Sequence, residues 1–335
     1  MTSRRRVSLK MSLEALQLSA PFVITGYTFT EMMVVVARLN DGAATGEGEA
    51  AGVYYLGDND PQMSAGIESV RKEIEAGANR EELRKLLPPC GARNALDCAM
   101  WDLEAKRSGR PAWSLAGLEP PHRLTTTFTI GAGEPGVMAG KATRYSQARA
   151  LKLKLTGQVA LDAERVHAVR KARPEVWLGV DANQGFTPDT LEEMMPTLVT
   201  SAVKLVEQPF ARGREADLDD FESPIPVAAD ESVQGIADVE SLVGRFDVVN
   251  IKLDKCGGLT EGLAMAAEVR RLGMNVMVGN MVGTSLAMAP AFLVGQLCDI
   301  VDLDGPIFIT RDRTPAISYD QGFAFYPDKG WGSAG

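Results

Sequence analysis

The chain has 335 residues, of which 45% are hydrophobic and 24% are charged, and its formal net charge is −9. This composition is typical of a globular protein with two structural units; it excludes a disordered chain, and no apolar run reaches the ~18 residues that a membrane helix needs. Because the negative charge argues against a nucleic-acid or anionic-membrane surface, we expect a cytoplasmic protein whose partner is a small molecule, with association into a homo-oligomer left open.

The first part of the chain reads as a mixed α+β unit. It contains a strand pattern at 34–42 and helical patterns at 64–77 and 91–109. We expect residues 1–122 to form this unit, and residues 314–335, which carry an aromatic strand pattern, to return to it.

A repeated pattern fills residues 123–313: a short apolar strand, a loop with acidic or glycine residues, and an amphipathic helix. Eight strands are predicted, and they begin near residues 126, 150, 176, 202, 225, 248, 274 and 298. Regular alternation of strands and helices over this length predicts a parallel barrel rather than an open sheet.

Acidic residues end three successive predicted strands. They are Asp181, Glu207 and Asp230, and in a parallel barrel such strand ends meet at the functional face. Three converging carboxylates repel one another unless a cation lies between them. Mg²⁺ prefers oxygen ligands of this kind, whereas zinc favours histidine and cysteine, which these strand ends lack. The sequence therefore predicts a magnesium site.

Lysines end the strands on either side of the three carboxylates. Lys154 precedes them and Lys252 follows them, and two bases across a metal site indicate removal of a proton next to a carboxylate. The resulting enediolate is stabilised by a divalent cation. Desolvation and the neighbouring charge of Lys152 are expected to lower the pKa of the catalytic lysine.

The stretch 248–254 is predicted to be extended. Alternation would then place Asn250, Lys252 and Asp254 on one polar face. Lys255 falls on the opposite face or in the following loop, so we expect it to be solvated or structural.

The last predicted strand ends with Asp302 and Asp304. Two carboxylates on one strand face form a good site for a cationic group. A role as a loop cap is the alternative, which is less favoured because Gly305 and Pro306 already supply the turn.

Taken together, these features resemble the enolase superfamily, specifically the dipeptide epimerases (L-Ala-D/L-Glu epimerase-like) of its muconate-lactonizing subgroup. The resemblance covers nearly the whole chain. It is carried by PFVI at 21, ARNALDCAMWDLEA at 92, KLKL at 152, DAN at 181, EQP at 207, ADES at 229, NIKLDKCGGLTE at 250 and VDLDGP at 301.

This resemblance implies a (β/α)₇β barrel capped by the α+β unit. It also implies that Asp181, Glu207 and Asp230 bind Mg²⁺ and that Lys154 and Lys252 act as an acid/base pair on opposite faces of the α-carbon. The implied reaction is epimerisation of a dipeptide at the α-carbon next to its C-terminal carboxylate, by 1,1-proton transfer through an enediolate.

The resemblance further implies how the substrate is held. Asp302 and Asp304 would bind its α-ammonium group, and Asn183, Gly26 and Tyr27 are expected to contact it. Relatives that act on L-Ala-D/L-Glu often carry an arginine in the first loop, for which residues 24–30 are the counterpart here. No Lys or Arg occurs from Met11 to Ala37, so we expect neutral or cationic side chains at the epimerised residue to be accepted at least as well as glutamate.

Three alternatives use the same barrel: an o-succinylbenzoate synthase-type lyase, an N-succinylamino-acid racemase, or a barrel without catalysis. The Asp302 and Asp304 pair disfavours the first two, whose substrates carry no ammonium group. The presence of both lysines and all three carboxylates disfavours the third. A mandelate racemase-like enzyme would need a histidine at the seventh strand end, but the only histidines are His122 and His167.

Overall fold

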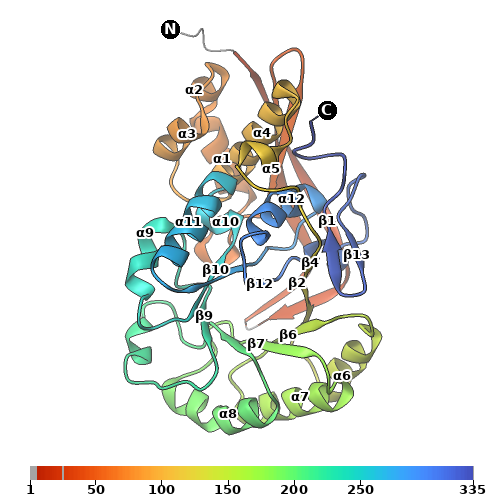
Figure 1. Cartoon of the computed structure of the whole chain (residues 1–335), viewed down its shortest axis with the longest axis vertical. Helices are drawn as coiled ribbons and strands as arrows, with labels where there is room; N and C mark the ends of the chain where they lie inside the picture. The colour runs from red at the N-terminus through yellow and green to blue at the C-terminus, as the bar shows by residue number, and fades with distance from the viewer. Residues whose placement is uncertain (1–5, 25, 335) are drawn as a thin grey trace.

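The computed structural model describes residues 6–24 and 26–334. Figure 1 shows helices of the N-terminal part at one end of the molecule and the barrel at the other, with a long hairpin connecting the two regions. The fold predicted from the sequence, an α/β barrel with an α+β cap, is confirmed.

The N-terminal unit combines an antiparallel sheet, in the order β1-β2-β3, with a group of helices. The strands are β1 (Ser8–Ile24), β2 (Tyr27–Asn40) and β3 (Thr45–Ala50); the helices are α1 (Asp60–Ser69), α2 (Arg71–Glu75), α3 (Arg80–Leu86), α4 (Gly91–Ser108) and α5 (Ala112–Leu115), with a 3₁₀ turn η1 (Tyr54–Leu56). The stretch 24–30, expected as a loop, is the tip of the β1–β2 hairpin; residue 25 lies outside the described residues.

Helix α4 lies directly on strand β3 because β3 presents glycine at the contact. A Cβ atom on Gly48 would lie 2.2 Å from the carbonyl oxygen of Ala95, and one on Gly46 would lie 2.2 Å from that of Ala99. No larger residue fits at either position without moving the helix backbone, so TGEGEA fixes how closely α4 approaches the sheet.

The barrel is a parallel sheet of eight strands in the order β12-β11-β10-β9-β8-β7-β6-β5. All eight predicted strands are confirmed, and each is shorter than its apolar pattern. They are β5 (Thr127–Ile130), β6 (Ala150–Lys154), β7 (Trp177–Asp181), β8 (Leu205–Glu207), β9 (Val227–Ala229), β10 (Val248–Ile251), β11 (Asn275–Val278) and β12 (Ile300–Val301). Within the described residues, no backbone ladder joins β12 to β5, so the barrel is nearly but not fully closed.

Helices connect the successive barrel strands, except that only a 3₁₀ turn is described between β8 and β9. They are α6 (Pro135–Arg144), α7 (Val159–Ala172), α8 (Pro188–Thr200), α9 (Ile236–Val239), α10 (Leu253–Cys256), α11 (Leu259–Arg271) and α12 (Ser285–Gly295), with 3₁₀ turns η2 (Glu215–Leu218), η3 (Glu240–Leu242) and η4 (Gly305–Phe308). Among the helices described, none combines the length and apolar character needed to cross a membrane.

The C-terminal tail contacts both parts of the molecule. Strands β13 (Ser318–Asp320) and β14 (Phe323–Phe325) form a small sheet with β4 (Leu124–Thr125), which precedes the barrel. Further on, the indole N–H of Trp331 donates to the carbonyl of Cys98 (3.1 Å), on α4. The domain limits 1–122, 123–313 and 314–335 stay a prediction.

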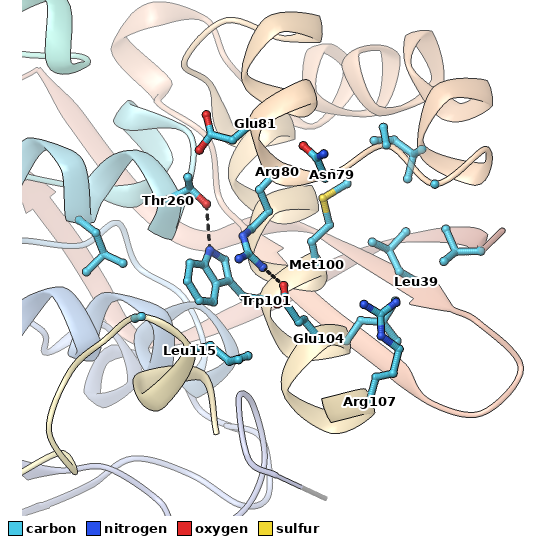
Figure 2. A pocket seen from close by; sticks show the side chains of 17 residues that line it. Leu39, Asn79, Arg80, Glu81, Met100, Trp101, Glu104, Arg107, Leu115 and Thr260 are labelled. Atoms are coloured by element: carbon cyan, nitrogen blue, oxygen red, sulfur yellow. Dashed lines mark hydrogen bonds and ion pairs between the residues drawn. The ribbon is translucent and has the colours of Figure 1, made fainter. Parts of the chain in front are cut away.

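Polar contacts join α4 to the barrel on the side of the helix away from β3. Both the backbone N–H and the hydroxyl of Thr260, on α11, donate to the carboxylate of Asp97 (2.9 and 2.6 Å). The indole N–H of Trp101 donates to the same hydroxyl (2.9 Å), as Figure 2 shows. Helix α4 thereby holds the N-terminal unit on the barrel beside β10.

Candidate active site

Five predicted residues meet at the carboxyl ends of neighbouring barrel strands. In the ladders, Lys154 is the partner of Asp181, and Asp181 is the partner of Glu207. Asp230 directly follows β9, and Lys252 directly follows β10. The strand order therefore places the three carboxylates side by side and one lysine on each side of them.

The three carboxylates form a compact buried group. One oxygen each from Asp181, Glu207 and Asp230 lies within 4.8 Å of the others, and the exposure of these residues is 1% or less. Burial first, and then the charge of Asp181, raises the pKa of Glu207. In addition, Glu207 Oε2 accepts no hydrogen bond from the described residues, although the ammonium of Lys152 lies 3.1 Å away. Three close, hard oxygen donors of this kind fit a divalent cation.

The two flanking ammonium groups contact this group directly. Lys154 Nζ lies 2.5 Å from Asp181 Oδ2, and Lys252 Nζ lies 2.6 Å from Asp230 Oδ2. Burial alone would lower the pKa of Lys252, but the carboxylates of Asp230 and Glu207 outweigh it and hold that pKa well above its usual range.

Lys152 lies deeper, among acidic groups. Its ammonium is 3.1 Å from Glu207 Oε2 and 3.9 Å from Asp181 Oδ2, and it donates to Asp302. The neighbouring Asp302 in turn has a lowered pKa: burial would raise it, but Lys152 outweighs burial. Lys152 thus connects the carboxylates of the central group to the last barrel strand.

Asp304 stands beside this network with a different environment. Its Oδ2 accepts from the backbone N–H of Thr129 (2.6 Å), and burial followed by the charge of Asp302 raises its pKa to about 6. Asp302 and Asp304 both line the same cavity as Lys154 and Lys252.

The prediction for 248–254 was right for two residues and wrong for one. Asn250 and Lys252 do share a face, and Asn250 Nδ2 donates to Glu207 Oε1 (2.7 Å). Asp254 does not, because helix α10 begins at Leu253 and ends the alternation. Its Oδ1 instead accepts from the backbone N–H groups of Ala51 and Gly52 (2.9 Å each), in the N-terminal unit.

Lys255 is structural and not solvated. Its ammonium is buried and donates to Asp230 Oδ1 (2.6 Å), Asp230 O (2.5 Å) and Asn250 O (3.1 Å). Asp230 is thus held by two lysines, whose charges lower its pKa although burial opposes this. Sequence reasoning missed the contact because the turn of α10 folds Lys255 back under the strand end.

Glu231 and Asn183 form a further buried contact that sequence reasoning did not predict. Asn183 Nδ2 donates to Glu231 Oε1 (3.3 Å), while burial and then the adjacent Asp230 raise the pKa of Glu231 to about 8. Asn183 belongs to the motif DAN and Glu231 to the motif ADES, so both residues were noticed in the sequence. The sequence of a single strand end does not reveal which residue on the next strand its acidic side chain contacts. Asn183 lines the cavity, as do Lys152 and Asp230.

The N-terminal unit covers the cavity with the hairpin and with η1. Among its residues, Phe22, Ile24, Phe29, Met32, Tyr54 and Tyr55 line the cavity. Gly26 and Tyr27, which were expected to contact substrate, lie at the hairpin tip, and neither belongs to this lining. Tyr27 is 43% exposed, and its ring centroid is 4.6 Å from that of Tyr54.

A larger hollow, of about 1000 Å³, lies elsewhere, between the N-terminal unit and helix α11 of the barrel. Its walls include Arg80, Trp101 and Glu104; the guanidinium of Arg80 lies 3.7 Å from the centroid of the Trp101 ring and pairs with Glu104 (Figure 2). No residue that lines this hollow also lines the barrel cavity. The group of carboxylates and lysines therefore identifies the barrel cavity as the candidate active site.

Two family models match the chain. "Mandelate racemase / muconate lactonizing enzyme, N-terminal domain" matches residues 6–117, and "Enolase C-terminal domain-like" matches residues 137–332.

Individual relatives agree with these matches. The chain is 39% identical to an L-Ala-D/L-Glu epimerase of Escherichia coli (strain K12), over 94% of this chain and 98% of the relative. It is 41% identical to an N-acetyl-D-glutamate racemase of a Pseudoalteromonas species, over 72% of this chain and 76% of the relative. A solved structure of an enolase family member from Agrobacterium tumefaciens, described as having homology to dipeptide epimerases with bound sodium and L-Ala-L-Glu, superposes with a TM-score of 0.93 at 40% identity, covering 96% of this chain and 98% of that one.

Proposed function

Because the chain belongs to the mandelate racemase/muconate lactonizing enzyme family and is an isomerase of amino acid derivatives, we propose that it epimerises a dipeptide at the α-carbon next to the C-terminal carboxylate. One observation carries the proposal: Lys154 and Lys252 lie on either side of the group formed by Asp181, Glu207 and Asp230. Such an arrangement suits removal of a proton from one face of a carbon and its return to the other.

Asp181, Glu207 and Asp230 would hold a divalent cation, for which Mg²⁺ is our proposal, since all three donors are carboxylate oxygens. When bound, this cation supplies positive charge that stabilises the enediolate and offsets the charge of the three carboxylates. In this scheme Lys154 and Lys252 exchange roles as base and acid, depending on which epimer is bound. Asp302 and Asp304 orient the dipeptide through its α-ammonium group; among the described residues, Asp302 pairs with Lys152, whereas Asp304 forms no ion pair.

The test uses the full chain with MgCl₂ in heavy water and a panel of L,L-dipeptides. We expect a mass increase of one unit at a single α-carbon, together with the appearance of the L,D epimer. Exchange at the N-terminal residue, or no exchange in any dipeptide, would contradict the proposal.

A second candidate, a racemase of N-acylated amino acids, is favoured by the likeness to the N-acetyl-D-glutamate racemase. It conflicts with the site, because an acylated nitrogen would leave the carboxylate of Asp304 buried without a cationic partner. The same heavy-water assay with N-acetyl-leucine, N-succinyl-leucine and Ala-Leu separates the two. We expect exchange only in Ala-Leu; faster exchange in either acylated amino acid would support the second candidate instead.

A further inference from the structure

The geometry of the cavity limits where the side chain of the epimerised residue can go. In the proposed function, the two lysines would approach the α-carbon from opposite faces, the carboxylate of the substrate would lie toward Asp181, Glu207 and Asp230, and the peptide nitrogen would continue toward Asp304. All of these groups come from the barrel. The side chain of the epimerised residue must therefore point away from the barrel, toward the N-terminal unit that covers the cavity.

Every residue that the N-terminal unit contributes to the cavity wall is apolar or aromatic. Among the described residues there are six: Phe22, Ile24, Phe29, Met32, Tyr54 and Tyr55. In this set no carboxylate, ammonium or guanidinium group is present to pair with a charged substrate side chain.

The rings divide between two sides of the cavity mouth. Tyr54 and Tyr55 lie near Lys252 and Asp230, whose charges act on both phenols. Phe29 joins them, with its ring centroid 5.3 Å from that of Tyr54, and the centroids of Tyr54 and Tyr55 are 5.2 Å apart. We call this group of three rings the ring wall; it consists of Phe29, Tyr54 and Tyr55.

Phe22 lies on the other side of the mouth. Its ring centroid is 4.9 Å from that of Phe308, which follows Asp304 in η4. Lys141 lies over Phe308, with its ammonium 5.4 Å from the ring centroid, and its charge interacts with Asp304. This cation is therefore placed on the side of the N-terminal residue of the dipeptide, away from the ring wall.

The cations in the cavity are already paired. Among the described residues that line it, Lys152, Lys154 and Lys252 are the only basic ones, and each ammonium contacts a carboxylate. A glutamate side chain directed at the ring wall would be desolvated against aromatic carbon without a free counter-charge.

We infer that this enzyme acts on dipeptides whose C-terminal residue has a bulky apolar or aromatic side chain, which packs on Phe29, Tyr54 and Tyr55. The inference rests on the proposed function and specifies its substrate class. It departs from the glutamate dipeptides named for the relatives from Escherichia coli and Agrobacterium tumefaciens. Stacking and apolar burial favour leucine or phenylalanine at this position, whereas an acidic side chain loses hydration there.

The experiment compares kcat/KM of the full chain, with MgCl₂, for L-Ala-L-Phe, L-Ala-L-Leu, L-Ala-L-Glu and L-Ala-L-Lys, by quantifying the D-containing epimer. We expect Ala-Phe and Ala-Leu to exceed Ala-Glu at least tenfold. An Ala-Glu value equal to or above theirs overturns the inference while leaving the proposed function intact. A preference for Ala-Lys also overturns it, because it would show that the rings bind a cation.

A substitution in the ring wall should shift the substrate preference from apolar toward acidic side chains. Phe29→Arg supplies a guanidinium at the wall, and we expect the ratio of Ala-Glu to Ala-Phe to rise at least tenfold. Leu13→Arg is the matched control: Leu13 is 47% exposed and lies in the stem of the same hairpin, opposite Val35, so the ratio should not change. An equal change in both variants overturns the assignment of the ring wall.

The assays of the unaltered chain on the four dipeptides decide the inference even if Phe29→Arg does not fold. Absence of α-proton exchange in all four dipeptides would contradict the proposed function itself, and the inference with it. Exchange in Ala-Glu alone would contradict only the inference.

Discussion

The buried ammonium of Lys255 holds Asp230 from below, donating to its Oδ1 (2.6 Å) and to its backbone carbonyl (2.5 Å). Lys252 approaches the other carboxylate oxygen of the same residue (2.6 Å). One lysine thus fixes the position of Asp230, while the other stands at the cavity. The two lysines of NIKLDKCGG, three residues apart, therefore have separate tasks.

We predict that Lys255→Met destabilises the fold. It removes one partner of a buried charged pair, which costs about 3 kcal/mol or more of unfolding free energy. Chemical denaturation in the presence of a chelator measures this without a contribution from bound metal. Lys204→Met, at an exposed position before β8, is the control and should change stability little. Equal stability of the two variants would show that the contact with Asp230 is dispensable.

A second prediction concerns the three clustered carboxylates. Asp181→Asn, Glu207→Gln and Asp230→Asn should each lower kcat/KM by at least about a hundredfold, because each removes a charge that balances the cation. Added MgCl₂ should raise the thermal midpoint of the unaltered chain and not that of Asp181→Asn. The exposed Asp189→Asn serves as control. Full activity after treatment with a chelator would rule out the metal assignment.

The two lysines should differ in stereochemistry. Each reaches only one face of a planar enediolate, so Lys154→Ala and Lys252→Ala should both stop epimerisation. Each variant should still exchange the α-proton of one epimer with heavy water, and the two variants should act on opposite epimers. Mass spectrometry of separately supplied L,L and L,D dipeptides measures this. A lysine variant with normal epimerisation would be incompatible with two bases.

Asp254 should make stability depend on pH. Burial, the largest cause, and the charges of Asp58 and Glu49 raise its pKa from an ordinary 3.8 to about 7, although the N–H groups of Gly52 and Ala51 oppose this. Between these values the folded state holds a proton that the unfolded state has lost, so stability falls as pH rises from about 4 to about 7.

The measurement is the thermal midpoint across this range for the unaltered chain and for Asp254→Asn. The variant keeps an acceptor for the N–H groups of Ala51 and Gly52 but does not titrate. Its thermal midpoint should therefore fall less steeply as the pH rises. Asp97, whose pKa burial raises to about 6, contributes in the same direction in both proteins. Identical slopes would show that Asp254 does not hold this proton.

The candidate site was predictable where the strand pattern alone determines position. Lys154, Asp181 and Glu207 lie at the ends of three adjacent parallel strands, and parallel strand ends necessarily meet at one face. Apolar strands separated by amphipathic helices likewise sufficed to predict the barrel. In each case a local pattern determines a position that needs no long-range contact.

What could not be predicted depends on contacts between distant segments or on where a strand ends. Asp254 was misplaced, and the contact of Lys255 with Asp230 was missed, because β10 ends at Ile251 and a helix follows at once, with Gly257 and Gly258 at positive φ closing it. Strand β1 was not predicted, and its register shifts between Gln17 and Phe22. Only the folded chain reveals that this strand brings Phe22 and Ile24 to the cavity in the barrel.

The unclosed join between β5 and β12 restricts how this enzyme could be redesigned. Where a backbone ladder is absent, side chains span the join: Asp304 accepts from the N–H of Thr129, Asp302 accepts from Thr127, and the hydroxyl of Thr126 accepts from the N–H of Leu303 (2.9 Å). The acidic pair proposed to read the substrate's ammonium group therefore also fastens the scaffold. An engineer who exchanged it for another recognition group would loosen the barrel. New specificities are accordingly more accessible through the cap than through the barrel wall.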